Sequence, residues 1–210
     1  MTPYYEDEST TIYHGDCREI LPTLGRFDLL LTDPPYGIDF GGCNASTRDW
    51  DRITGDTSTE LAKFIFDYLP KNQDAVIWGA NKFPQLLPHR GVWICWDKRL
   101  TEAADRMIGS AIELAWENKS SGCDTIFRVL HGGVVNSDGG DRFHPTQKPS
   151  KLFRKVLGRY PDAETIIDPF MGSGTTLVAS KLEGRKAVGI ELEERYCEIA
   201  ANRLCQGVLF

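Results

Sequence analysis

Apolar and polar positions form two patterns along this chain, one typical of strands and one typical of helices. Short continuous apolar runs predict strands at residues 11–14, 27–32, 75–78, 92–96, 111–116, 125–130, 165–168 and 187–191. Stretches with helical spacing predict helices at residues 17–24, 59–69, 149–159, 175–182 and 193–204. Because continuous apolar strands that alternate with helices are typical of a sheet covered on both faces, we expect an α/β fold with a doubly wound, mostly parallel sheet.

Two segments show neither the strand pattern nor the helix pattern. Residues 37–57 are rich in Gly, Asn, Ser, Thr and Asp, and residues 132–146 contain two glycine pairs among polar residues. Long irregular loops in compact domains are often functional, so we expect residues 37–57 to form a mobile loop beside a site. No internal repeat or linker divides the chain, and we therefore expect a single domain over residues 1–210.

The most informative stretch is the end of the run at 27–32, which passes directly into Asp33-Pro34-Pro35-Tyr36. Neither proline can donate to a sheet ladder, so the chain must leave the sheet there. Ligands of open α/β sheets bind outside the carboxyl ends of the strands. A stiff corner that presents a carboxylate, carbonyl groups and an aromatic ring suits a planar, amine-bearing ring. A plain turn after a strand is the alternative interpretation.

A second acidic corner follows the strand expected at 165–168. It reads Asp168-Pro169-Phe170-Met171-Gly172-Ser173-Gly174-Thr175-Thr176. Glycines at such a turn let the backbone approach a ligand closely, and the amides of the following helix point at that ligand. Position 177 is leucine, so this is not the G-x-G-x-x-G dinucleotide fingerprint. The next strand ends at Glu191, where nucleotide-binding units place an acid for ribose hydroxyls. Together these features predict a ligand that combines an amino acid with a nucleoside.

Composition and charge narrow the class of protein. The chain has a net charge of −6, with 26% charged residues, which is ordinary for a globular protein. Its six cysteines form no C-x-x-C pair, so we expect reduced thiols and no metal site. No apolar run is long enough to span a membrane, and residues 1–11 are too polar and acidic for a signal peptide. We therefore expect a cytoplasmic protein.

The charge is unevenly distributed. Residues 142–160 contain no acid, and their cations are Arg142, Lys148, Lys151, Arg154, Lys155 and Arg159. A run of this kind usually forms a solvated helix face. Within an otherwise acidic chain it is also a candidate place for phosphate groups, so nucleic acid stays among the expected partners.

Three motifs in this order resemble the amino-methyltransferases of DNA. They are Asp33-Pro34-Pro35-Tyr36, His144-Pro145-Thr146-Gln147-Lys148-Pro149 and the glycine loop at 168–176. Enzymes of this family use S-adenosylmethionine to methylate N6 of adenine or N4 of cytosine. The early acidic corner and the late glycine loop resemble the circularly permuted beta group of the family, over residues 13–204. The resemblance implies a Rossmann-like fold with permuted motif order and a single catalytic domain.

The resemblance assigns a separate role to each part of the acidic corner. The Asp33 carboxylate and the Pro34 carbonyl accept hydrogen bonds from the two N–H groups of the base amine, while Pro35 keeps the corner stiff. Tyr36 stacks on the base, which must first be flipped out of the duplex. The methyl group is then displaced directly from the sulfonium, without a covalent enzyme adduct, so most of the rate comes from alignment and fixed dipoles.

The resemblance also implies the cofactor site. It places Asp168 near the amino group of the cofactor and Glu191 at its ribose. Asp16 matches an early acid that accepts from the adenine amine of the cofactor, although Asp16 is equally suited to cap the helix expected at Cys17. The full implied set of cofactor contacts is Asp16, Thr146, Lys148, Asp168, Phe170, Gly172, Ser173, Gly174, Thr175 and Glu191.

The chain departs from the family in the region that reads the target sequence. Only residues 118–143 are available for a target-recognition insert, which is too short for an independent reading module. Recognition could be short, could involve a partner in a homodimer, or could rest on the loop at 37–57. Double-stranded DNA is the expected partner, with Lys151, Arg154 and Lys155 as candidate phosphate contacts.

Alternatives to N6-adenine methylation stay open. Aspartate at position 33 favours adenine, since cytosine-N4 enzymes more often have serine there, but N4-cytosine methylation is an alternative. Methylation of RNA or of a protein amide needs similar geometry, although protein-amide enzymes favour asparagine at this position. A methyltransferase-like module that binds DNA or a partner without turnover is a further alternative, which the intact motifs disfavour. Restriction-modification is a common setting for this family, whereas the small size of this chain suggests a solitary enzyme.

Overall fold

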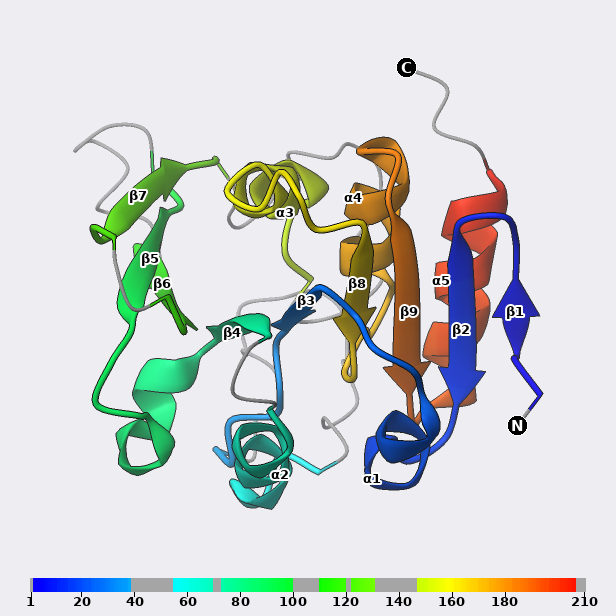
Figure 1. The fold of residues 1–210 in the computed structure, drawn as a ribbon, viewed down its shortest axis with the longest axis horizontal. Coiled ribbons are helices and arrows are strands. Elements are labelled where there is room, and N and C mark those ends of the chain that lie inside the picture. The colour runs from blue at the N-terminus through cyan, green and yellow to red at the C-terminus, as the bar shows by residue number, and fades with distance from the viewer. Residues whose placement is uncertain are drawn as a thin grey trace, which may run out of the picture. The chain divides into compact units, whose positions relative to one another are not determined.

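The computed structural model describes residues 2–38, 55–69, 73–99, 110–119, 122–130 and 147–206. Contacts divide the chain into two compact units, one formed by residues 1–33 and 142–210 and the other by residues 34–141. Figure 1 shows the strands and helices of both units.

The first unit contains a sheet whose four parallel strands end at a common edge. Its strands are, in spatial order, β1 (Tyr5–Glu6), β2 (Thr10–His14), β9 (Lys186–Glu191), β8 (Thr165–Asp168) and β3 (Leu29–Thr32). β2, β9, β8 and β3 run parallel, and β1 pairs antiparallel with β2. The register pairs His14 with Glu191 and Asp168 with Gly189. The carboxyl ends of the four parallel strands therefore lie together, which is where ligands of such sheets bind.

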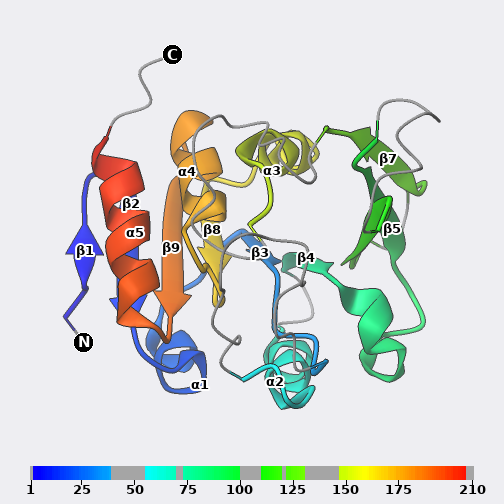
Figure 2. The same ribbon diagram turned by 180° about the vertical axis from the view of Figure 1, so that it is seen from behind.

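Helices cover this sheet and supply its core. They are α1 (Cys17–Ile20), the 3₁₀ turn η1 (Leu21–Thr23), α3 (Ser150–Leu157), α4 (Thr175–Leu182) and α5 (Glu194–Cys205). α4 and α5 cover the same face, since both lie behind the strands in Figure 1 and in front of them in Figure 2. Ile12, Leu29 and Ile190 are fully buried between the layers.

The second unit contains a mixed sheet. Its strand order is β4 (Asp74–Trp78), β6 (Ile112–Glu117), β5 (Val92–Asp97) and β7 (Thr125–Arg128). β6 is antiparallel to both of its neighbours, whereas β7 is parallel to β5. The unit also contains α2 (Glu60–Tyr68) and the 3₁₀ turns η2 (Ala80–Lys82) and η3 (Pro84–Leu86). Trp78 and Trp96 meet edge to face at its centre, with ring centroids 6.3 Å apart.

The structure confirms the predicted α/β fold, and every predicted strand and helix is present with small shifts at its ends. β1, η2 and η3 were not predicted, because each is too short to show a period. The expected mobile loop at 37–57 and recognition insert at 118–143 fall largely outside the described residues, so both stay predictions, as does the single catalytic domain. Within the part of the chain that the structure describes, no helix is long and apolar enough to cross a bilayer.

Candidate functional site

The loop between β8 and α4 is a tight turn that contains several predicted site residues. Gly172 and Gly174 adopt left-handed backbone conformations, with φ of 51° and 79°, which favour glycine. A Cβ atom at Gly174 would lie only 2.7 Å from the Cβ of Ala200 in α5. Gly174 is also the N-cap of α4 and offers no side chain to the first-turn amides. Those amides are therefore suited to an anionic group.

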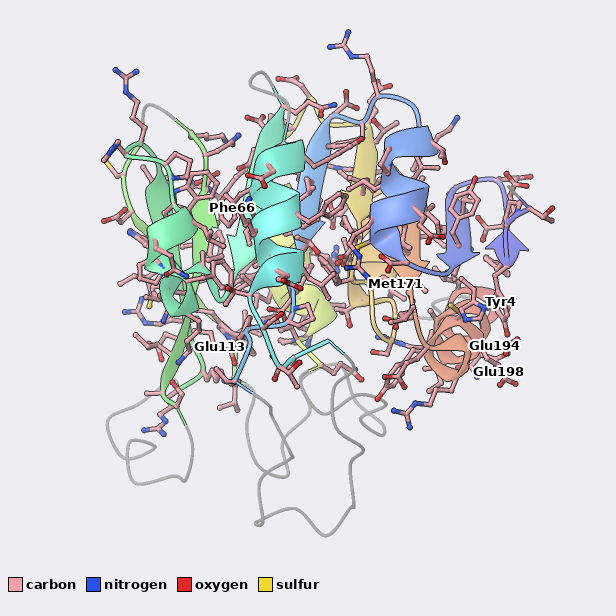
Figure 3. The ribbon with its side chains drawn as sticks, turned by 90° about the horizontal axis from the view of Figure 1, so that it is seen from below. Tyr4, Phe66, Glu113, Met171, Glu194 and Glu198 are labelled. Carbon is pink, nitrogen blue, oxygen red and sulfur yellow. The ribbon has the colours of Figure 1, made fainter. Side chains whose placement is uncertain are left out.

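Side chains from neighbouring elements hold this glycine loop in place. The Arg203 guanidinium, from α5, donates to the carbonyl of Ser173 and lies 3.4 Å from the Thr175 hydroxyl. Met171 packs on β9 (Figure 3), so that a Cβ at Gly189 would lie 2.4 Å from its sulfur. Sequence reasoning found the loop but missed Arg203, because nothing in a helical pattern marks one arginine as a loop support.

Asp168 lies at the end of β8 and is almost completely buried. The hydroxyl of Thr32 donates to its carboxylate at 2.7 Å, and the amide of Phe170 donates at 3.1 Å. The hydroxyl of Thr176 also donates to it. Burial raises the pKa of Asp168 to about 6, against the opposing effect of these hydrogen bonds. A cationic group beside Asp168 would favour its ionised form.

Glu191 lies at the end of β9 and connects that strand to the glycine loop. Its Oε2 accepts from the amide of Gly172 at 3.0 Å, and its Oε1 accepts from the amide of Glu193 at 2.8 Å. Burial raises the pKa of Glu191 to about 7. Phe170 and Glu191 are only half-buried, so the loop and the acid border the same accessible edge of the sheet.

Asp16 performs the capping role that the sequence allowed. Its carboxylate accepts from the amide of Arg18 at 2.8 Å, as an N-cap does, and it also pairs with the Arg18 guanidinium. These contacts with Arg18 lower the pKa of Asp16. Because Gly15 donates to the Glu191 carbonyl at 2.9 Å, Asp16 lies at the same edge as Glu191. Its role toward a cofactor stays a prediction.

Asp33 directly follows β3, and its carboxylate forms an ion pair with the ammonium of Lys148. The Lys148 side chain is only 4% exposed and that of Asp33 is 20% exposed. The adjacent Gln147 side chain accepts from the Ser173 hydroxyl at 3.5 Å. Two consecutive residues of the predicted motif at 144–149 therefore contact different parts of the site. Lys148 contacts the acidic corner, and Gln147 contacts the glycine loop.

The remainder of the acidic corner belongs to the second unit. Pro34 is buried, Pro35 is half-buried, and the half-buried Tyr36 ring lies against Gly79. Gly79 has a φ of 67°, and a Cβ there would lie 2.0 Å from the Tyr36 ring. The buried Asp56 accepts from the amide of Gly37 at 2.8 Å and so fixes the turn after Tyr36. Sequence reasoning missed Gly79 and Asp56, whose contacts depend on the fold.

The remaining predicted site residues are Thr146 and three cations of α3. Thr146 lies outside the described residues. Lys151, Arg154 and Lys155 are exposed on α3, whose opposite side is buried, and Arg154 pairs with Glu183 at 2.6 Å. Their contact with phosphate stays a prediction. Among the described residues, no three His, Cys, Asp or Glu side chains are grouped as a metal site would require.

Comparisons with known proteins agree with this arrangement of elements. The family model N6_N4_Mtase, described as DNA methylase, matches residues 70–202. The Type II methyltransferase M2.LlaDCHI of Lactococcus lactis subsp. cremoris is 26% identical and aligns over 99% of this chain and 94% of its own length. The Type II methyltransferase M.ScaI of Streptomyces caespitosus is also 26% identical, over 96% of this chain and 83% of its own.

Solved structures share the fold at lower identity. The M1.HpyAVI–SAM complex superimposes with a TM-score of 0.58 at 22% identity, covering 93% of this chain and 98% of that one. The PvuII DNA methyltransferase, described as cytosine-N4-specific, gives a TM-score of 0.65 at 15% identity, covering 99% of this chain and 90% of that one.

Proposed function

Because the chain belongs to the DNA methylase family, whose model matches residues 70–202, we propose that it transfers a methyl group from S-adenosylmethionine to the exocyclic amine of a flipped-out DNA base. The favoured target is N6 of adenine. The observation that carries the proposal is the placement of Asp33 at the end of β3, beside a strand whose end, Asp168, opens the glycine loop. Thr32 donates to Asp168 at 2.7 Å and so joins the two corners directly.

The acids and the helix start fit S-adenosylmethionine chemically. Asp168 and Glu191 are carboxylates whose pKa is raised by burial, and a cationic ligand with ribose hydroxyls offers them charge and donors. The first-turn amides of α4 suit the carboxylate of an amino acid. When bound, S-adenosylmethionine supplies an electrophilic methyl group on its sulfonium.

The residues of the acidic corner then act on the base. An exocyclic amine is a poor nucleophile because its lone pair is delocalised into the ring. Hydrogen bonds from both N–H groups of the amine, accepted by the Asp33 carboxylate and the Pro34 carbonyl, turn the nitrogen toward tetrahedral geometry. Tyr36, held against Gly79, provides the face on which the base stacks. The corner therefore contributes alignment and electrostatic stabilisation, with no enzyme nucleophile.

The proposal is tested by incubating the purified protein with methyl-labelled S-adenosylmethionine and unmethylated plasmid DNA. We expect label in DNA, and mass spectrometry of the nucleosides should show N6-methyladenine. N4-methylcytosine instead would assign the alternative target base. Transfer to RNA or protein but not to DNA would contradict the proposal, and cofactor binding with no transfer to any substrate would favour the binding-module alternative.

A matched set of variants separates catalysis from folding. Asp33→Ala should abolish transfer while cofactor binding is retained, because Asp33 acts on the base. Removal of Asp33 alone takes the carboxylate away from the buried Lys148 ammonium, so a double variant Asp33→Ala/Lys148→Met, which removes both charges, serves as the comparison for folding. Asp67→Ala, at an exposed position of α2, is the control and should keep full transfer.

A further inference from the structure

The ion pair between Lys148 and Asp33 joins the predicted motif at 144–149 to the acidic corner. The ammonium of Lys148 is nearly inaccessible, with only 4% of the side chain exposed. An ammonium ion is removed from water at a large free-energy cost unless it is paired and hydrogen-bonded. The partner here is the carboxylate that the proposed reaction depends on, so the position of Lys148 bears directly on the position of that carboxylate.

The backbone around Lys148 is held on both sides. On one side, Gln147 is buried and accepts from the Ser173 hydroxyl of the glycine loop. On the other side, Pro149 is the N-cap of α3, and its carbonyl accepts from the amide of Leu152 at 3.0 Å. α3 is anchored in turn, since its residues Leu152, Phe153, Val156 and Leu157 are buried. The ammonium is therefore presented from a fixed segment rather than from a freely moving side chain.

We infer that Lys148 is a positioning residue for methyl transfer, because the contact of its buried ammonium with Asp33 fixes the carboxylate that receives the base amine. The inference rests on the proposed function. It differs from the predicted role of Lys148 as a cofactor contact, because the effect passes through Asp33. Lys148 also links the proposed base site at Asp33 to the proposed cofactor site, since the segment that carries Lys148 contacts the glycine loop through Gln147.

A second lysine–aspartate pair provides a matched control. Lys181, in α4, pairs with Asp7 at 2.6 Å, with side chains that are 34% and 24% exposed. Asp7 precedes β2 and Lys181 is in the last turn of α4, both away from the carboxyl ends of the parallel strands. Loss of this pair should lower stability without a specific effect on the transfer step.

The test compares Lys148→Met and Lys181→Met with the wild type. The single-turnover rate of methyl transfer to plasmid DNA is measured at saturating cofactor, and the Kd of S-adenosylhomocysteine is measured by calorimetry. For Lys148→Met we expect a rate loss of about 100-fold, the usual consequence of a displaced catalytic group, with the Kd changed by less than about threefold. For Lys181→Met we expect an unchanged rate and a lower melting temperature.

Two results would overturn the inference: a Lys148→Met rate close to that of the wild type, or a loss of cofactor affinity as large as the loss of rate. The second result would make Lys148 a cofactor contact. If Lys148→Met does not fold, Lys148→Arg carries the test, since it keeps the charge but shifts it. We expect Lys148→Arg to bind cofactor normally and to be slower by about tenfold, and an unchanged rate would refute the positioning role. No transfer by the wild type would refute the proposed function itself.

Discussion

Asp168→Asn should stabilise the cofactor-free protein at neutral pH while it weakens cofactor binding. Asp168 is 3% exposed, and its burial raises the pKa from the ordinary value of 3.8 to about 6. The folded protein therefore has to ionise this group in an unfavourable environment. Asparagine has nearly the same shape and keeps an oxygen that can accept from Thr32 and from the amide of Phe170. The variant resembles the protonated aspartate and does not ionise.

The sign and size of the effect follow from linkage between protonation and folding. A carboxyl group whose pKa is raised in the folded state does not lower the free energy of unfolding well below pH 3.8, where it is protonated in both the folded and the unfolded protein. As the pH rises, the unfolded chain ionises first and stability falls, until the folded protein also ionises near pH 6. Each pKa unit is worth about 1.4 kcal/mol, so the full penalty is on the order of 3 kcal/mol. We expect Asp168→Asn to exceed the wild type by about 1 kcal/mol at pH 4.5 and by about 3 kcal/mol above pH 7.

The assay is urea unfolding followed by tryptophan fluorescence, at several values between pH 4.5 and pH 8. The difference in unfolding free energy between variant and wild type isolates Asp168, because the other groups cancel. Asp28→Asn is the control. Hydrogen bonds from Thr165 lower the pKa of Asp28, so this group stays ionised throughout the range and its difference curve should be flat. A flat curve for Asp168→Asn, or one that falls with pH, would refute the reasoning.

Three further substitutions test the glycine loop, the proposed stacking of the base on Tyr36 and the predicted contact of Glu191 with ribose. Gly174→Ala places a Cβ against Ala200 and forces a left-handed backbone, which costs about 1–2 kcal/mol. Because relief of this strain shifts the loop and displaces the first-turn amides of α4, calorimetry should show cofactor affinity reduced by about tenfold. Gly79→Ala displaces the Tyr36 ring, so steady-state kinetics should show a raised KM for DNA with the cofactor Kd unchanged. Because the pKa of Glu191 is raised to about 7, cofactor affinity should increase between pH 6 and pH 8, and Glu191→Gln should reduce this slope in calorimetric titrations to the smaller contribution of Asp168.

Most elements of the fold were predictable from sequence because the longer strands lie in short apolar runs and each long helix has a clear period. β8 and α4 have the predicted bounds, and the turn between them is signalled locally by Gly172 and Gly174. The direction of β6 was not predictable, since an apolar run reads the same in either direction. Its antiparallel pairing with both neighbours is set by the connections around it.

The contacts that organise the candidate site join residues far apart in sequence. The hydrogen bond from Thr32 to Asp168 links positions separated by 136 residues, and the pair of Lys148 with Asp33 spans 115 residues. Local motifs identified these acids as candidates but could not select their partners. Partner choice depends on strand order, which places the end of β3 beside the end of β8. The raised pKa of Asp168 is likewise a result of burial, which only the packed structure shows.

The buried acids at this edge lead us to expect a preference for a cationic donor over its neutral product. Asp168 and Glu191 both have a raised pKa through burial, and the nearby Asp33 adds to the effect at Asp168. We expect a bound sulfonium to offset part of the cost of ionising these acids, since opposite charge favours the ionised form. Transfer of the methyl group removes that positive charge while the carboxylates remain. We therefore expect the burial that destabilises the cofactor-free protein to strengthen binding of the donor relative to S-adenosylhomocysteine, and so to favour exchange of product for fresh donor.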